Sequence, residues 1–186
     1  VHTLKLNLTI REKELRNRKE IFLKALRLAK TPILISLFVT PIRFLLELAG
    51  LSENVIFIIG LLWLTLAFAV YWGIKLFSEK RPYLLLILSL IIFSPVSRLT
   101  VVVAWWIDTR WEIGTHYSLH FDSFSQAAFQ QVVYGSLIQI IPGFIIGSLI
   151  IAIMQYRKRL KKANNIILQN DDFNCDIIQN TGNIFK

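Results

Sequence analysis

Four charged or amide side chains lie inside apolar stretches of this sequence. Arg43 and Glu47 are four residues apart, and Arg98 and Gln139 lie in two later apolar stretches. A charge inside a membrane helix costs ~2.5–3.5 kcal/mol on insertion scales, so it is normally paired or faces a polar cavity. At ~1.5 Å per residue, all of them fall in the outer half of a bilayer. We predict one polar cluster that contains Arg43, Glu47, Arg98 and Gln139.

This predicted cluster has two interpretations. Arg43 and Glu47 share a helix face, so charge pairing in this layer would fix the register of neighbouring helices. Two arginines against one glutamate also leave a net positive charge, which suits an anionic group. The residue types alone leave both a structural clasp and an anion site open.

A second series of candidate residues combines carboxylates with histidines. Its members follow one another at intervals of four residues: Asp108, Glu112, His116 and His120. Histidine and carboxylate one helical turn apart can hold a divalent metal. However, Gly114 interrupts the series, and the H-E-x-x-H motif is absent. We therefore predict no cofactor, and keep a divalent metal at these residues as the alternative.

A small-residue motif lies in the last apolar stretch. Gly143 and Gly147 form a G-x-x-x-G pattern, which lets another helix approach closely. The approaching helix can belong to a second copy of the chain or to the same chain. Gly60 and Gly73 mark the candidate internal partner.

The basic residues separate the apolar stretches in a regular way. Of 21 Lys and Arg, nine lie in residues 1–31, three in 75–81 and five in 157–162. Membrane insertion retains Lys and Arg on the cytoplasmic side. Because the charges flank apolar stretches instead of forming a basic domain, nucleic acid is not the predicted partner. We predict a protein of a prokaryotic cytoplasmic membrane with both termini in the cytoplasm.

The predicted fold class is an all-α membrane protein with a four-helix bundle. Fifty-four per cent of the residues are apolar, which is high for a soluble domain. The membrane domain is predicted to cover residues 32–156. The predicted spans are about 33–50, 55–76, 83–107 and 131–156.

The remaining segments are predicted to lie outside the bilayer core. Residues 1–31 form a basic amphipathic segment on the cytoplasmic surface, facing anionic headgroups, in which residues 11–30 are predicted as a helix that runs directly into the first span. The aromatic residues of 108–130 place that segment in the outer interface, where Asp122 or Ser123 can cap a helix from residue 124. The polar tail, residues 163–186, is predicted to be disordered.

Three functions are compatible with these features. The first is a non-enzymatic component that assembles with itself or with other membrane subunits. The second is a small transporter or channel subunit that uses the Arg/Glu layer. The third is a metal-dependent membrane enzyme that uses the exterior histidines and carboxylates. Nucleotide-binding and nucleophile motifs are absent from the sequence.

Overall fold

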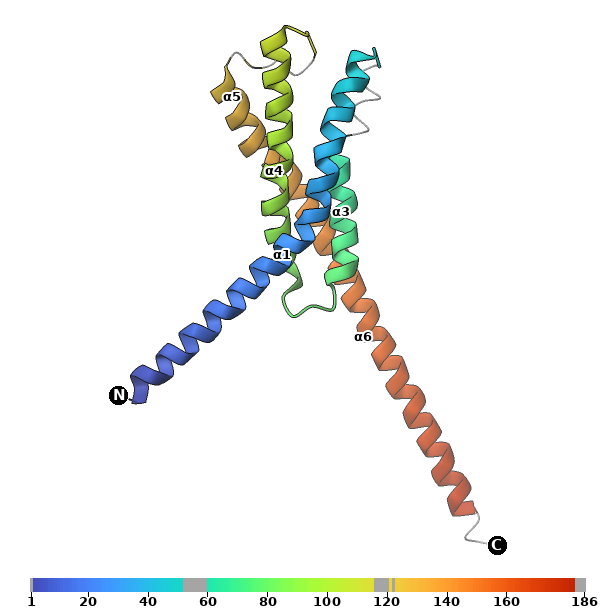
Figure 1. The fold of residues 1–186 in the computed structure, drawn as a ribbon. Helices are drawn as coiled ribbons and strands as arrows, with labels where there is room; N and C mark the ends of the chain where they lie inside the picture. The colour runs from blue at the N-terminus through green and yellow to red at the C-terminus, as the bar shows by residue number, and fades with distance from the viewer. Residues whose placement is uncertain (1, 52–59, 116–120, 122, 183–186) are drawn as a thin grey trace.

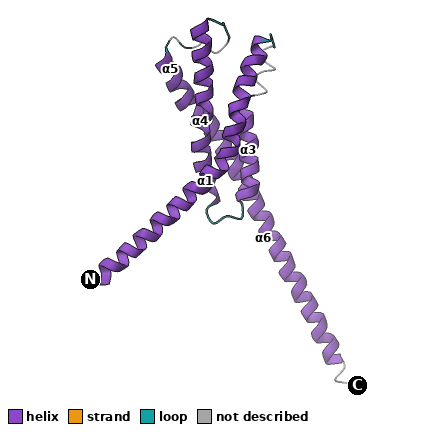
Figure 2. Cartoon of the chain, in the orientation of Figure 1, coloured by secondary structure: helices purple, strands orange, loops and turns teal. Residues whose placement is uncertain are grey.

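The computed structural model describes residues 2–51, 60–115, 121 and 123–182, and this part of the chain is helical apart from short turns and loops. Figure 2 shows helices and connecting loops, with no strand in the described residues. Before residue 11 and after residue 164 only the backbone is described. The elements in chain order are α1 (His2–Leu48), α3 (Leu61–Leu76), α4 (Pro82–Trp111), α5 (Phe124–Phe129), the π-helical η1 (Gln130–Gly135) and α6 (Ser136–Gly182).

Three helical stretches in the described residues are long and apolar enough to cross a membrane. They are Arg11–Leu48, Pro82–Trp111 and the continuous stretch Phe124–Asn164. The shorter α3 is also apolar, with 16 residues. The predicted second span, 55–76, begins in residues 52–59, which lie outside the described residues.

The consecutive helices α1, α3 and α4 alternate in direction. One buried cluster contains Ala25, Leu76, Leu85 and Ile151, and therefore joins α1, the end of α3, the start of α4 and α6. A second cluster contains Leu61, Trp105 and Ala127, against which Val39 and Phe44 pack. Each of α1, α3 and α4 has residues in or against both clusters, so α3 runs opposite to α1 and α4 (Figure 1).

The turn between α3 and α4 gathers the basic segments at one end. Lys24 of α1 forms a 2.6 Å salt bridge with Glu79. From α6, Gln155 donates to the carbonyl of Phe77 at 3.3 Å, and Lys158 Nζ lies 3.5 Å from Ser78 Oγ. The three basic groups of the sequence therefore meet at the same end of the bundle. The outer parts of α1 and α6 leave the bundle from this end and diverge (Figure 1).

The helix boundaries differ from the sequence predictions at both ends of the chain. Residues 11–30 are predicted as a helix that runs directly into the first span, and α1, which already begins at His2, continues without a break through Pro32 and Pro41. A continuous helix is possible because side-chain hydroxyls and neighbouring helices satisfy groups that proline leaves unpaired.

The tail also differs from its prediction. Residues 163–186 are expected to be disordered, whereas α6 continues to Gly182. No proline or glycine occurs between Gly147 and Gly182. The tail's polar composition favours exposure to water, but it contains no residue that breaks a helix.

The segment before α6 follows the predicted cap. The side chain of Ser123 accepts a hydrogen bond from the backbone N–H of Gln126, so the predicted capping of a helix from residue 124 is confirmed. The helix then widens into η1 before α6 begins. A π-helical turn of this kind changes the angular register of the helix, so side chains after the turn point in different directions from those that a regular α-helix would give.

Helices α3 and α6 approach each other closely at two glycines. A Cβ atom added to Gly73 would lie 2.8 Å from Ile150 Cβ and 3.0 Å from the carbonyl oxygen of Gly147. A Cβ added to Gly147 would lie 2.7 Å from a methyl group of Leu86 and 3.2 Å from the carbonyl oxygen of Ala69. Only glycine allows this separation of the two backbones.

We predict that Gly73→Ala destabilises the bundle. Alanine gains up to ~1 kcal/mol in helix propensity, but overpacking costs ~1–3 kcal/mol. The obstructing atoms are a Cβ and a backbone oxygen, which cannot rotate away. Thermal unfolding in detergent should show a lower midpoint. The control Ala152→Leu adds volume at an exposed position of α6 and should leave the midpoint unchanged; a Gly73→Ala midpoint equal to that of the wild type contradicts the packing argument.

Candidate functional site

The predicted polar layer is distributed over the helix contacts that α4 makes. Gln139 is fully buried in α6, and its Oε1 lies 3.4 Å from Ser97 Oγ on α4. Ser97 has one hydroxyl proton, and its nearer acceptor is the carbonyl of Ser94 at 2.8 Å. The bond to Gln139 is therefore the weaker of the two, and Gln139 Nε2 has no hydrogen-bond partner among the described residues.

Arg98 extends from α4 towards the π-helical segment. Its guanidinium donates to Gln131 Oε1 of η1 at 3.3 Å. Gly135 provides the space for this side chain, because an added Cβ there would lie 3.0 Å from Arg98 Nε. The π-helix thus brings both a polar partner and a residue without a side chain to the arginine.

Arg43 and Glu47 lie near the end of α1 and are half-buried. The Nε atom of Arg43 is buried and has no hydrogen-bond partner among the described residues. One turn earlier, Thr40 and Thr100 share a hydrogen bond of 2.7 Å, which links α1 to α4. In this part of the structure one polar contact joins α1 to α4 among side chains that are mostly apolar.

Sequence reasoning missed Thr100 and Gln131 as members of this layer. Thr100 donates to the carbonyl of Ser97 at 2.6 Å, and Ser97 donates to Ser94 in the same way. The hydroxyl residues therefore recur at every third position along α4. That spacing is visible in the sequence and was the available signal, whereas nothing in the sequence pairs Gln131 with Arg98.

The acidic and histidine series does not lie on one helix. Helix α4 ends at Trp111, and Glu112 has a left-handed backbone with φ of 49°. The backbone N–H of Thr115 donates to the fully buried carboxylate of Asp108 at 3.0 Å. Asp108 therefore helps to close the end of its own helix. His116 and His120 lie outside the described residues, and no group of three metal-ligating side chains occurs within them.

The glycines of the last stretch face helices of the same chain. An added Cβ at Gly143 would lie 3.1 Å from Leu90 and 3.2 Å from Thr65, so this residue packs against α4 and α3. Gly147 packs against the same two helices. In these contacts the approaching helices belong to the same chain, which is one of the two alternatives for this motif. On α3, Gly73 lies opposite Gly147.

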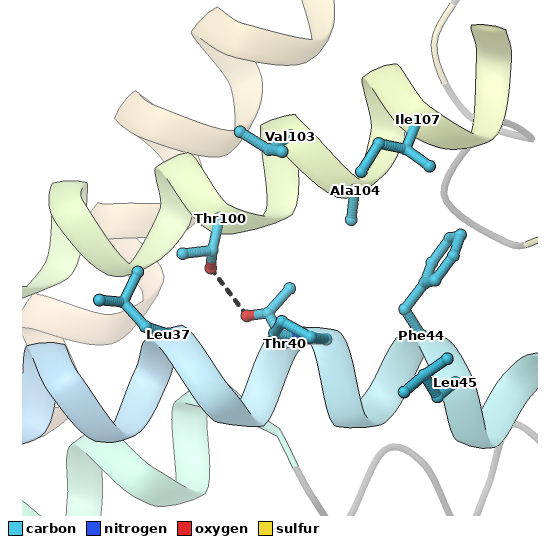
Figure 3. A pocket seen from close by; sticks show the side chains of 9 residues that line it. Leu37, Thr40, Phe44, Leu45, Thr100, Val103, Ala104 and Ile107 are labelled. Carbon is cyan, nitrogen blue, oxygen red and sulfur yellow. Dashed lines mark hydrogen bonds between the residues drawn. The ribbon is translucent and has the colours of Figure 1, made fainter.

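A groove of about 430 Å³ lies between α1 and α4 beside the polar layer (Figure 3). Apolar side chains dominate its lining, and the hydroxyls of Thr40 and Thr100 are occupied by their mutual hydrogen bond. The groove therefore offers no charged group to bind a polar substrate. Its lining residues are Leu37, Thr40, Pro41, Phe44, Leu45, Thr100, Val103, Ala104 and Ile107.

Comparisons with protein-family models, with curated proteins and with solved structures found no match.

We predict that Gln139→Leu preserves or raises the stability of the bundle. A buried donor without a partner costs ~1–3 kcal/mol, and leucine removes that donor while filling a similar volume. Ser97 keeps its shorter bond to the carbonyl of Ser94. Thermal unfolding in detergent is the measurement, with Thr40→Val as the control that removes a well-formed bond worth ~0.6 kcal/mol. A clear loss of stability in Gln139→Leu would mean that its amide has a strong partner.

Proposed function

We propose that this chain is a non-enzymatic, integral component of a prokaryotic cytoplasmic membrane that assembles with itself or with other membrane subunits. It has four spans and both termini in the cytoplasm. The observation that carries the proposal is the gathering of all three basic groups at the end from which both terminal helices leave the bundle.

The orientation follows from the charges at that end. The turn that contacts Lys24 and Lys158 is itself basic, with Lys80 and Arg81. Lys and Arg are retained on the cytoplasmic side during insertion. At the opposite end Trp105, Trp106 and Trp111 supply aromatic groups of the kind found at membrane interfaces. We therefore assign the basic end to the cytoplasm.

The fourth crossing follows from chain continuity. Helix α1 ends at Leu48, remote from the basic end, and α4 starts at Pro82, directly after the basic turn. The chain must return between these points, and α3 runs in that direction. Its 16 residues cover ~24 Å of the ~30 Å of the hydrocarbon core.

The terminal helices support the assembly role. At 47 residues each, α1 and α6 are far longer than the ~20 residues that a crossing requires. Residues 11–20 and 156–164 are exposed, and Leu15 and Leu160 add apolar groups to these charged surfaces. Helical arms with mixed apolar and basic faces are suited to helix–helix contacts with a partner.

The orientation predicts which cysteines an impermeant reagent can reach. In a Cys175→Ser background, Thr109→Cys should react with an impermeant maleimide in intact cells. Lys19→Cys and Lys162→Cys should react only after the cells are permeabilised. All three positions are exposed. Reaction of Lys19→Cys in intact cells would overturn the proposed orientation.

The assembly role predicts a native mass above that of one chain. Native mass spectrometry in mild detergent should give a larger complex for the full chain. Deletion of residues 165–186, or of residues 2–18, should release subunits from this complex. Its mass should therefore fall by more than the mass of the deleted residues. The control deletes only residues 183–186. A monomeric full chain, or arm deletions that leave a larger complex intact, would contradict the proposed role.

A transporter or channel subunit is the second candidate. It is favoured by the buried Arg43 Nε and Gln139 Nε2 atoms, which lack hydrogen-bond partners among the described residues. Donors of this kind fit a water-filled or ligand-filled layer.

The two candidates differ in whether water reaches the polar layer. Ser136 is buried beside Gln139, with 4% of its surface exposed. In a packed assembly component, Ser136→Cys should stay unreactive towards a small water-soluble thiol reagent, as Ser94→Cys should. The exposed Thr109→Cys is the positive control. Rapid modification of Ser136→Cys in the folded protein would favour the transporter.

A further inference from the structure

A small cavity with two cationic side chains lies between α1 and α3 near the basic end. Its volume is about 140 Å³, several times the ~30 Å³ share of one water molecule. Arg27, Leu28 and Thr31 of α1 form one side. Phe68, Tyr71 and Lys75 of α3 form the other, and no carboxylate lines the cavity.

The polar groups of this cavity come from both helices. Lys75 Nζ lies 3.4 Å from the hydroxyl of Tyr71 and 5.5 Å from the centre of its ring. Arg27 and Thr31 are one helical turn apart on α1, so they share a face. Two cations and two hydroxyls can each donate a hydrogen bond to one anionic group.

The apolar part of the cavity is rigidly supported. The ring of Phe68 lies 5.9 Å from that of Trp72 and 6.2 Å from that of Tyr71. Trp72 is fully buried, and both Leu28 and Phe68 pack against the buried cluster that contains it. A ligand that fills this cavity therefore meets a fixed apolar wall beneath its charged group.

We propose that this cavity binds the phosphate of an anionic phospholipid, which bridges α1 and α3. The inference rests on the orientation proposed above and is independent of the assembly role. In that orientation the cavity lies at the headgroup level of the cytoplasmic leaflet, where Tyr and Lys are typical anchors. Basic pockets between helices at this level suit phosphorylated headgroups.

The positive charges that line the cavity explain why an anionic ligand is favoured there. Near the cavity, the carboxylate of Glu79 already pairs with Lys24 at 2.6 Å. Arg27 and Lys75 face the same cavity from neighbouring helices and repel each other across it. A phosphate diester between them turns this repulsion into two attractive contacts, and its acyl chains continue along the exposed apolar surface of the bundle.

Thermal unfolding of the delipidated full chain in mild detergent tests the proposal. Phosphatidylglycerol should raise the unfolding midpoint, whereas phosphatidylcholine should have little effect. For Arg27→Gln/Lys75→Gln, half-maximal stabilisation should require about 25-fold more phosphatidylglycerol, since each basic group near the surface contributes about fivefold. The matched control Lys30→Gln/Lys80→Gln removes the same charge outside the cavity and should respond as the wild type does.

Three outcomes would overturn the proposal. The first is an unchanged lipid response in Arg27→Gln/Lys75→Gln. The second is an equal loss in the matched control, which would indicate general surface charge. The third is equal stabilisation by inorganic phosphate at the same concentration, which would indicate a free anion.

If the double variant does not fold, Tyr71→Phe supplies the test, since it should weaken the lipid response and leave the lipid-free midpoint close to that of the wild type. A Tyr71→Phe response equal to that of the wild type would also count against the proposal.

Discussion

The close approach of α3 and α6 is the contact on which the remaining arrangement depends. Two glycines, Gly73 and Gly147, bring the helices together until backbone atoms limit the distance. Little hydrophobic force acts between helices in lipid, so van der Waals packing of this kind must supply the attraction. The contact also places Leu86 of α4 against Gly147, and it holds the end of α3 beside Gln155 and the basic start of the α6 arm.

Composition and hydropathy were sufficient to predict the class of this fold. Apolar length predicts helices, and a bilayer permits few alternatives because every backbone group must be paired internally. Local signals also succeeded where one side chain acts on its own helix, as Ser123 does at the start of α5. The ends of the chain were harder to predict. Polarity alone suggested disorder after residue 162, whereas helix continuity depends on the absence of breaking residues.

The sequence predicts a layer of polar residues, but it does not predict the hydrogen-bonding partners of those residues. Depth along each helix placed Arg98 and Gln139 in that layer. Their hydrogen-bonding partners, Gln131 and Ser97, depend on how the helices are rotated. The six-residue π-helix sets that rotation for one helix, and composition carries no signal for it. The spacing of four residues from Asp108 onward has its helical meaning only while a helix continues, and α4 ends at Trp111.

Because α1 is continuous, a movement of one half of the helix is transmitted to the other half. The helix is held at Lys24 by the salt bridge and at Ala25 and Ala29 by the buried cluster. From Ala25 it reaches ~35 Å outward to His2 and ~35 Å inward to Leu48. A tilt of the outer half about the basic end therefore moves the region near Arg43 in the opposite direction. The outer arm and the inner half, which carries the Thr40–Thr100 hydrogen bond, are of equal length on the two sides of this point.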